Sequence, residues 1–371
     1  MNAPLVVFRA DAALHIGTGH VMRCITLAET LRARGAACRF VCRAHPGHLI
    51  EHIRQRGFAV AALPSVPTKA VAPAADGPRL PAHPHWLGAD WQTDAEQTRA
   101  ALGDEPVDWL VVDHYALDAR WEQRLRPACR RLMVIDDLAD RPHACDLLLD
   151  QNLGRRATDY AALVPDCCAV LAGPQYALLR PEFAALRPYS LARRERPRLE
   201  HLLVTMGGVD KDNATGRVLD ALRCCPLPPD GRLTVVMGAR APWLEHVRGL
   251  AATLPWPSDV RVDVDDMAQL MADSDLAIGA AGTTAWERCC LGLPSISMIL
   301  APNQKAGALA LGDAGAVLVA PHGPELAARL AEQLRQVSHT ERLAALSAAA
   351  RAITDGGGAW RVVEAMAHER Q

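Results

Sequence analysis

Three apolar runs in the first half of the chain end in polar residues, and this pattern restricts the fold more than any other feature. The runs are residues 109–115, 131–137 and 145–152. Continuous apolar runs of this kind are typical of strands buried in a parallel sheet, and the carboxyl ends of such strands meet at one edge. We therefore expect an α/β fold with polar side chains gathered at that edge. The simpler alternative is that Asp and Asn merely end the strands and cap helices.

A glycine loop joins the first strand-like run, residues 5–8, to a helix-like segment. Its candidate functional residues are Arg9, Asp11, Gly17, Gly19 and His20. In open α/β sheets, ligands bind at loops beyond the carboxyl ends of strands. A helix N-terminus disfavours a charged imidazole, so His20 is a candidate general base. Arg9 and Asp11 could simply pair with each other.

The second half of the chain repeats the strand, glycine loop and helix and adds features of a nucleotide site. Residues 201–206 lead into Gly207 and Gly208, and a loop of small residues, 280–284, precedes Glu287. Glycine amides can bind phosphate oxygens, and a carboxylate can accept from both ribose hydroxyls. Each feature has a simpler alternative: a tight turn for the glycines, and placement against the helix dipole for Glu287. The two glycine loops and the acid together favour a nucleotide-diphosphate site, and neither loop carries the dinucleotide or Walker A fingerprint.

Two Rossmann-like domains account for the 371 residues. We expect the first over residues 1–190, a polar and basic linker over 191–199, and the second over 200–371. The last helix, near 360–368, is expected to pack back on the first domain. The predicted architecture is two such α/β domains facing across a cleft.

Residues 64–90 interrupt the first domain with a segment rich in Pro, Ala and His that lacks periodicity. Loops of this length are usually functional lids or disordered inserts. We expect an irregular, mobile insert. His83 and His85 are expected to face solvent and not to bind metal.

Composition excludes several classes of partner. The formal net charge is −2, with 40 basic and 42 acidic residues, so we expect no nucleic-acid interface. No apolar window is long enough to cross a membrane, and Arg9 and Asp11 interrupt the N-terminal run before it reaches signal-peptide length. The 11 cysteines lack zinc spacing, so we expect buried reduced thiols. These features predict a cytoplasmic protein, which we expect to be a monomer without metal or cofactor.

Several motifs in both halves resemble those of a known family. In order along the chain they are R-A-D-x-x-x-x-I-G-T-G-H-V-M-R (9–23), V-V-D-H-Y (111–115), I-D-D-L-A-D-R-P-H (135–143), C-D-L-L-L-D-Q-N (145–152), P-Q-Y-A-L-L-R-P-E-F (174–183), M-G-G-V-D (206–210) and A-A-G-T-T-A-W-E-R-C-C-L-G-L-P (280–294). The layout looks like the GT-B glycosyltransferases. Within that superfamily, the sequence resembles the UDP-sugar hydrolases of pseudaminic acid biosynthesis. It departs from the shorter relatives mainly in the 64–90 insert.

The resemblance implies a reaction and assigns residues to it. The family removes UDP from UDP-2,4-diacetamido-2,4,6-trideoxy-β-L-altropyranose by attack of water at the anomeric carbon, with inversion and without a metal. His20 would be the base. The residues expected on the sugar side are Arg9, Asp11, Gly17, Gly19, Asp113 and Tyr115. Those expected to bind UDP are Gly207, Gly208, Asp210, Gly282, Thr283, Thr284, Glu287 and Gln304. A glycosyltransferase, a hydrolysing UDP-sugar 2-epimerase and a non-catalytic nucleotide-sugar sensor are the alternatives.

Overall fold

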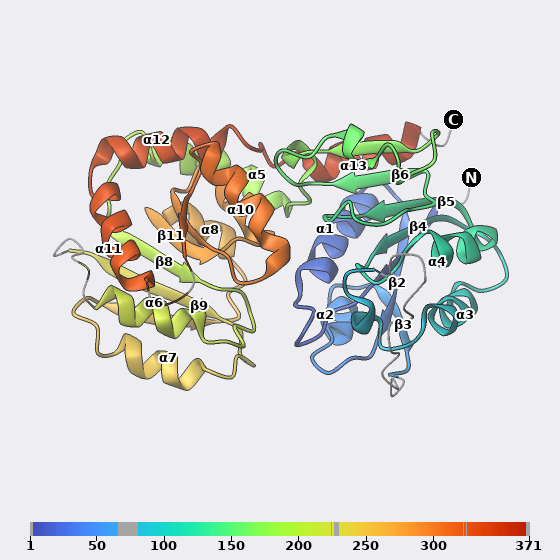
Figure 1. Ribbon diagram of the computed structural model, residues 1–371, viewed down its shortest axis with the longest axis horizontal. Coiled ribbons are helices and arrows are strands. Elements are labelled where there is room, and N and C mark those ends of the chain that lie inside the picture. Colours follow the sequence, from blue (N-terminus) through green and yellow to red (C-terminus); the bar gives the residue numbers. More distant parts are fainter. Residues whose placement is uncertain are drawn as a thin grey trace. The chain divides into compact units, whose positions relative to one another are not determined.

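A computed structural model describes residues 3–65, 81–223, 225, 230–321, 323 and 325–368. The chain divides into two compact units (Figure 1). The first comprises Met1–Leu178 and Ala359–Gln371, and the second comprises Leu179–Gly358. Each unit contains one parallel sheet with helices against it. The predicted α/β fold with two Rossmann-like sheets is therefore confirmed.

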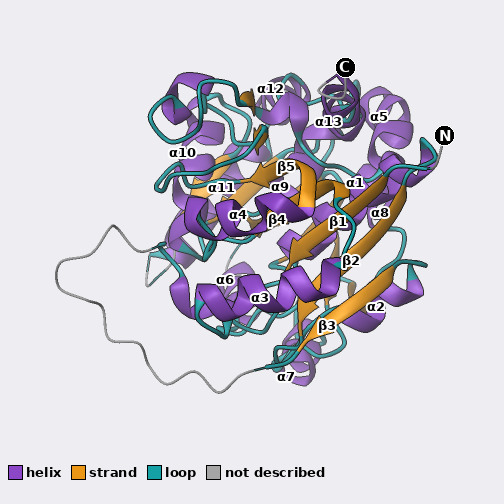
Figure 2. Ribbon diagram, turned by 90° about the vertical axis from the view of Figure 1, so that its right-hand side faces the viewer, coloured by secondary structure: helices purple, strands orange, loops and turns teal. Residues whose placement is uncertain are grey.

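The sheet of the first unit has seven strands in the order β3-β2-β1-β4-β5-β6-β7. In chain order the strands are β1 (Leu5–Ala10), β2 (Ala37–Arg43), β3 (Ala59–Leu63), β4 (Val107–Asp113), β5 (Cys129–Ile135), β6 (Leu147–Asp150) and β7 (Ala169–Ala172). Figure 2 shows β1, β2 and β3 side by side. The strand order reverses between β1 and β4, which pair in parallel with Ala10 opposite Asp113. Such a switch point is where ligands bind in open α/β sheets.

Helices cover both faces of this sheet, and one of them comes from the far end of the sequence. They are α1 (Gly19–Ala33), α2 (Ile50–Gln55), α3 (Trp91–Leu102), α4 (Ala119–Leu125) and α13 (Gly358–His368), with short 3₁₀ helices η1 (Pro84–Leu87), η2 (Arg126–Ala128), η3 (Ala157–Tyr160) and η4 (Pro174–Tyr176). Val362 and Met366 of α13 lie four residues apart and are buried. They join a hydrophobic cluster with residues of α1 and β1, such as Val21 and Phe8. This helix therefore completes the core of the first unit.

The sheet of the second unit has six strands in the order β10-β9-β8-β11-β12-β13. They are β8 (His201–Thr205), β9 (Arg232–Met237), β10 (Ser258–Val262), β11 (Leu276–Ala280), β12 (Ser295–Met298) and β13 (Leu318–Ala320). The helices are α5 (Pro181–Arg193), α6 (Ala214–Leu222), α7 (Leu244–Ala251), α8 (Met267–Asp273), α9 (Thr284–Cys290), α10 (Lys305–Asp313), α11 (Leu326–Val337) and α12 (Thr340–Arg351), with η5 (Pro302–Gln304) before α10. The sheet again reverses its order beside its first strand, β8, which pairs with both β9 and β11.

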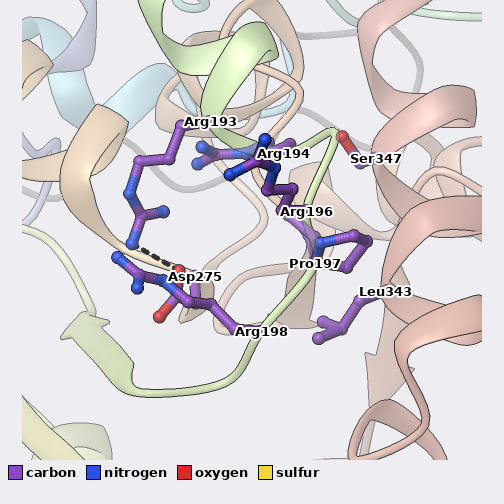
Figure 3. A pocket seen from close by; sticks show the side chains of 9 residues that line it. Arg193, Arg194, Arg196, Pro197, Arg198, Asp275, Leu343 and Ser347 are labelled. Carbon is purple, nitrogen blue, oxygen red and sulfur yellow. Dashed lines mark ion pairs between the residues drawn. The ribbon is translucent and has the colours of Figure 1, made fainter.

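The basic run at the end of α5 and directly after it packs within the second unit (Figure 3). Arg193 pairs with Asp275 at 2.5 Å, and the buried Arg194 guanidinium donates to main-chain oxygens that include Gly292 O and Ser274 O, each at 2.9 Å. Burial lowers the pKa of Arg194 to about 10. Residues 191–193, which we expected at the start of a linker, are the end of helix α5. The partners of Arg193 and Arg194 lie about 80 to 100 positions further along the chain, and the spacing of residues in the sequence does not show such contacts.

Two sequence expectations concern membranes and thiols. Within the parts of the chain that the structure describes, no helix has both the length and the apolar character that crossing a membrane needs. Buried free thiols among the described cysteines include Cys24, Cys42, Cys129, Cys145, Cys289 and Cys290. Cys167 is exposed, however, so the expectation of burial is wrong for this residue.

Candidate active site

The loop after β1 and the start of α1 place His20 at the carboxyl edge of the first sheet. Gly17 adopts φ 87°, a left-handed conformation that favours glycine, and its N–H donates to Ala13 O at 2.8 Å. Gly19 is the first residue of α1, and His20 is the second. The His20 residue is 8% exposed. This short turn brings the imidazole to the end of the neighbouring strand, β4.

His20 is held by the buried carboxylate of Asp113, the last residue of β4. Nδ1 of His20 lies 2.6 Å from Oδ1 of Asp113. Burial favours the protonated acid, but Arg23 and His20 hold the pKa of the Asp113 carboxyl well below its usual range. An ionised carboxylate only accepts hydrogen bonds, so Nδ1 carries the hydrogen of this bond. No hydrogen bond among the described residues involves Nε2 of His20, which leaves this atom available as a base.

Arg23, one turn beyond His20, holds the Asp113 carboxylate in position. Its Nε and Nη2 donate to the two oxygens of Asp113 at 2.6 and 2.7 Å. Its Nη1 donates to Asp137 at 2.7 Å, and the Tyr115 hydroxyl donates to the same Asp137 oxygen at 2.6 Å. Burial raises the pKa of Tyr115 well above its ordinary value, so the phenol keeps its proton. The Tyr115 ring meets the His20 ring edge to face, with centroids 4.6 Å apart.

The structure therefore brings together three of the predicted first-unit residues: His20, Asp113 and Tyr115. Asp113 was expected to contact the sugar, whereas its two oxygens are occupied by His20 and Arg23. The sequence reasoning did not single out Arg23 or Asp137. Both lie inside the motifs that it quoted: Arg23 lies one helical turn after His20, and Asp137 follows the strand-like run 131–135, and these places were the available signal.

Arg9 and Asp11 take a different part from the one that we expected. Both side chains are fully buried and pair with each other at 2.7 Å. Arg9 also pairs with Asp94 on α3 at 2.7 Å, and Arg43 of β2 pairs with the same carboxylate at 2.6 Å. His114 Nε2 lies 3.3 Å from Asp11. These residues form a buried ionic network beneath the loop, and neither Arg9 nor Asp11 exposes surface to a ligand.

In the second unit, Gly207 and Gly208 follow β8 and leave open space above the loop. Gly207 adopts φ 95°, and a Cβ at either glycine would meet no atom within 4 Å. Gly208 O accepts from the N–H of Gly238 at 3.1 Å. The Asp210 carboxylate accepts from the backbone N–H groups of Ala214 and Thr215, each at 2.8 Å. Asp210 therefore shapes the start of α6, and its contribution to a ligand would be indirect.

The second predicted loop lies between β11 and α9. Thr283 precedes α9, and Thr284 Oγ1 accepts from the buried Arg288 at 3.2 Å. The Gln304 side chain accepts from Leu300 N at 2.9 Å, and its Nε2 would lie 3.7 Å from a Cβ at Gly282. The structure therefore groups Gly282 with Thr283, Thr284 and Gln304.

Glu287, in the first turn of α9, is partly exposed and has a cationic neighbour. Its side chain is 17% exposed, and Arg180 Nη2 lies 3.9 Å from Oε1. Burial raises the pKa of Glu287, with Arg180 acting in the opposite direction. Sequence reasoning missed Arg180, although it lies in the quoted motif of residues 174–183.

These two units, each with a glycine loop after its first strand, have the GT-B class of fold. The crystal structure of MurG from Acinetobacter baumannii has a TM-score of 0.67 and 16% sequence identity, covering 98% of this chain and 99% of that one. Residues 255–356 match the glycosyltransferase family 28 C-terminal domain.

Two curated proteins extend the comparison to sequence. The chain is 25% identical over 314 residues to the UDP-2,4-diacetamido-2,4,6-trideoxy-β-L-altropyranose hydrolase of Campylobacter jejuni, covering 84% of this chain and 97% of the relative. It is 32% identical over 153 residues to the spore coat polysaccharide biosynthesis protein SpsG of Bacillus subtilis, covering 40% of this chain and 43% of that protein. The resemblance drawn from the motifs is therefore confirmed.

Proposed function

We propose that this protein is a UDP-sugar hydrolase of pseudaminic acid biosynthesis that acts on UDP-2,4-diacetamido-2,4,6-trideoxy-β-L-altropyranose. The observation that carries the proposal is the ionised Asp113 bonded to Nδ1 of His20, which leaves Nε2 as a base. The similarity to the Campylobacter hydrolase over 84% of the chain supports the choice of substrate.

In the proposed reaction, Nε2 of His20 accepts a proton from water. The water oxygen forms a bond to the anomeric carbon while the bond from that carbon to the β-phosphate oxygen breaks, so the configuration inverts. The electron pair leaves with UDP, and the proton passes from His20 to solvent. Most glycosidases use one carboxylic acid to protonate a poor leaving group and a second carboxylate as base or nucleophile. UDP leaves as a stable anion and needs no proton from the protein, so the reaction requires a base but no general acid.

The loops of the second unit are proposed to bind UDP. Backbone amides at Gly207, Gly208 and Gly282 would hold the diphosphate, where fixed donors also stabilise the charge that develops on the leaving group. The side chains of Thr283, Thr284 and Gln304 would add polar contacts. Glu287, with Arg180 beside it, would accept hydrogen bonds from the ribose hydroxyls.

Release of UDP tests the proposal. The nucleotide sugar is incubated with the protein and a chelator, without an acceptor, and phosphorus NMR follows UDP. We expect UDP and free sugar, with turnover reduced about 10²- to 10⁴-fold in His20→Asn, the range that general-base catalysis contributes. UDP should bind His20→Asn as it binds the wild type. The control is His246→Asn, an exposed histidine on α7.

Each other outcome contradicts part of the proposal. Near-full activity of His20→Asn would remove His20 as the base. Loss of turnover with chelator alone would show that a metal is required. Release of UDP only when an acceptor alcohol is added would make the protein a transferase. Tight binding of the nucleotide sugar without any turnover would make it a sensor.

A further inference from the structure

A stack of rings lies against Tyr115, and the mechanism above does not use it. Trp86, on the short helix η1, stacks on Tyr115 with centroids 5.6 Å apart and planes 24° apart. His83 stacks on Trp86 at 4.2 Å and 22°. Burial and the neighbouring His85 lower the pKa of His83, which favours the uncharged ring. His83 and Tyr115 also lie 5.9 Å apart, with planes tilted by 33°, so the rings of His83, Trp86 and Tyr115 cluster into one aromatic surface.

The segment that carries Trp86 is anchored to the first unit directly after the ring. Leu87 is 2% exposed and packs in the hydrophobic cluster that includes Trp121. Gly88 adopts φ 68°, and a Cβ there would lie 2.5 Å from the His45 ring. Asp90 caps α3 by accepting from Thr93 N at 2.8 Å. The end of the insert, residues 87–90, is thus fixed by core packing and a helix cap, in contrast to the mobile loop that composition suggested.

The aromatic surface stands beside the catalytic base. The His20 ring is nearly perpendicular to Trp86, at 76° with centroids 6.1 Å apart, as it is to Tyr115. Trp86 is only half-buried, so part of the indole remains accessible. The Tyr115 hydroxyl is already committed to Asp137. A sugar whose anomeric carbon comes within reach of a water on His20 must therefore pass close to the indole.

We propose that Trp86 contacts the sugar and determines specificity: its indole packs against the apolar edge of the pyranose that carries the 6-deoxy methyl or the 4-acetamido methyl group, both of which UDP-N-acetylglucosamine lacks. An aromatic face buries methyl and C–H groups favourably but offers no partner to a hydroxyl, which would lose its water on contact. The surface thus selects nucleotide sugars that carry methyl groups in place of hydroxyls. This inference rests on the proposed function, since it assumes that the sugar reaches His20.

Binding measured without turnover tests the inference. In the His20→Asn background, calorimetry gives Kd for UDP, for the trideoxy diacetamido nucleotide sugar and for UDP-N-acetylglucosamine, with and without Trp86→Ala. We expect Trp86→Ala to raise the Kd for the trideoxy diacetamido nucleotide sugar by about 10- to 100-fold, the range for loss of apolar contacts in a specificity pocket. The Kd for UDP should not change, and the Kd for UDP-N-acetylglucosamine, which keeps its hydroxyls, should rise much less. Trp360→Ala, an exposed tryptophan of α13, is the control.

A structural role for Trp86 predicts a different pattern. If the ring only supports Tyr115 and His20, Trp86→Ala raises the Kd for both nucleotide sugars by the same factor. That result would overturn the inference. Trp86→Phe keeps a stacked ring with a smaller face, so it should reduce the preference for the trideoxy sugar less than Trp86→Ala does. This variant replaces Trp86→Ala in the test if Trp86→Ala fails to fold. Absence of UDP release by the wild type would defeat the proposed hydrolysis, while the two Kd ratios would still decide whether Trp86 contacts the sugar.

Discussion

Nδ1 of His20, at the start of helix α1, lies 2.6 Å from Oδ1 of Asp113, at the end of strand β4. Because β1 and β4 pair with Ala10 opposite Asp113, the loop after β1 delivers His20 to the end of β4. Arg23 grips both oxygens of the same carboxylate. The imidazole is therefore fixed in both orientation and tautomer, which is what a base needs.

Replacing Asp113 with Asn should therefore impair catalysis without preventing nucleotide binding. An amide can present only one oxygen, so it cannot accept from His20 and Arg23 on both sides, and the fixed tautomer is lost. We expect kcat for UDP release to fall by about 10²- to 10⁴-fold, comparable with loss of the base itself. Calorimetry should give an unchanged Kd for UDP. Asp104→Asn, in an exposed loop before β4, is the control. A variant with normal kcat and a normal melting temperature would show that Asp113 does not position His20.

Asp94 tests the buried network under the site. Its carboxylate accepts from Arg9 at 2.7 Å, from Arg43 at 2.6 Å and from Trp121 Nε1 at 3.0 Å. Asp94→Ala leaves two buried guanidinium groups short of a partner, which typically costs about 3–5 kcal/mol. Urea unfolding should show this loss in the free energy of unfolding, whereas Glu96→Ala, on the exposed side of α3, should change it little. A loss below about 1 kcal/mol would mean that the network relaxes or admits water.

Asp136 should make stability fall at acid pH. Burial opposes ionisation, but Arg141, whose Nη1 lies 2.8 Å from Oδ1, and His143 lower the pKa of Asp136 to about 2 from an ordinary 3.8. A lowered folded-state pKa stabilises the fold at every pH above the unfolded value, and this contribution is lost as pH falls through about 2. Its full size is on the order of 2 kcal/mol.

Urea unfolding of the wild type and Asp136→Asn checks this dependence on pH. The difference between their free energies of unfolding should be the same at pH 7 and pH 5 and smaller at pH 3, because the wild type begins to lose its advantage there. A difference that does not vary from pH 7 to pH 3 would contradict the lowered pKa.

Glu287 should distinguish nucleotides by their ribose. If its carboxylate accepts from both hydroxyls, the wild type should bind UDP more tightly than 2′-deoxy-UDP. Glu287→Ala should raise the Kd for UDP by about 10- to 100-fold, since hydrogen bonds to charged groups contribute roughly 1.5–3 kcal/mol. The variant should also bind UDP and 2′-deoxy-UDP equally. Glu245→Ala, exposed on α7, is the control. Equal Kd values for both nucleotides with the wild type would remove Glu287 from the proposed ribose site.

The sequence was sufficient to predict the α/β fold and the grouping of His20 with Asp113 and Tyr115. Apolar runs mark buried parallel strands, and such strands bring their carboxyl ends to one edge. It was insufficient where a side chain finds its partner far away. Arg9 pairs with Asp94 across 85 positions of sequence, and Asp210 is committed to backbone amides of α6. Trp86 lies in a segment without periodicity, and its place depends on tertiary contacts such as those of Leu87 and Gly88 and its own stacking on Tyr115.

The position of helix α13 at the end of the sequence affects the order in which the two units can complete their cores during synthesis. The first unit needs Val362 and Met366 to complete a cluster that otherwise comes from the beginning of the chain. Residues 179–358, by contrast, form their unit from one continuous stretch. On the ribosome, the second unit can therefore close its core while the first still lacks a helix. The half of the protein that is made first, and that carries His20, is the half that is finished last.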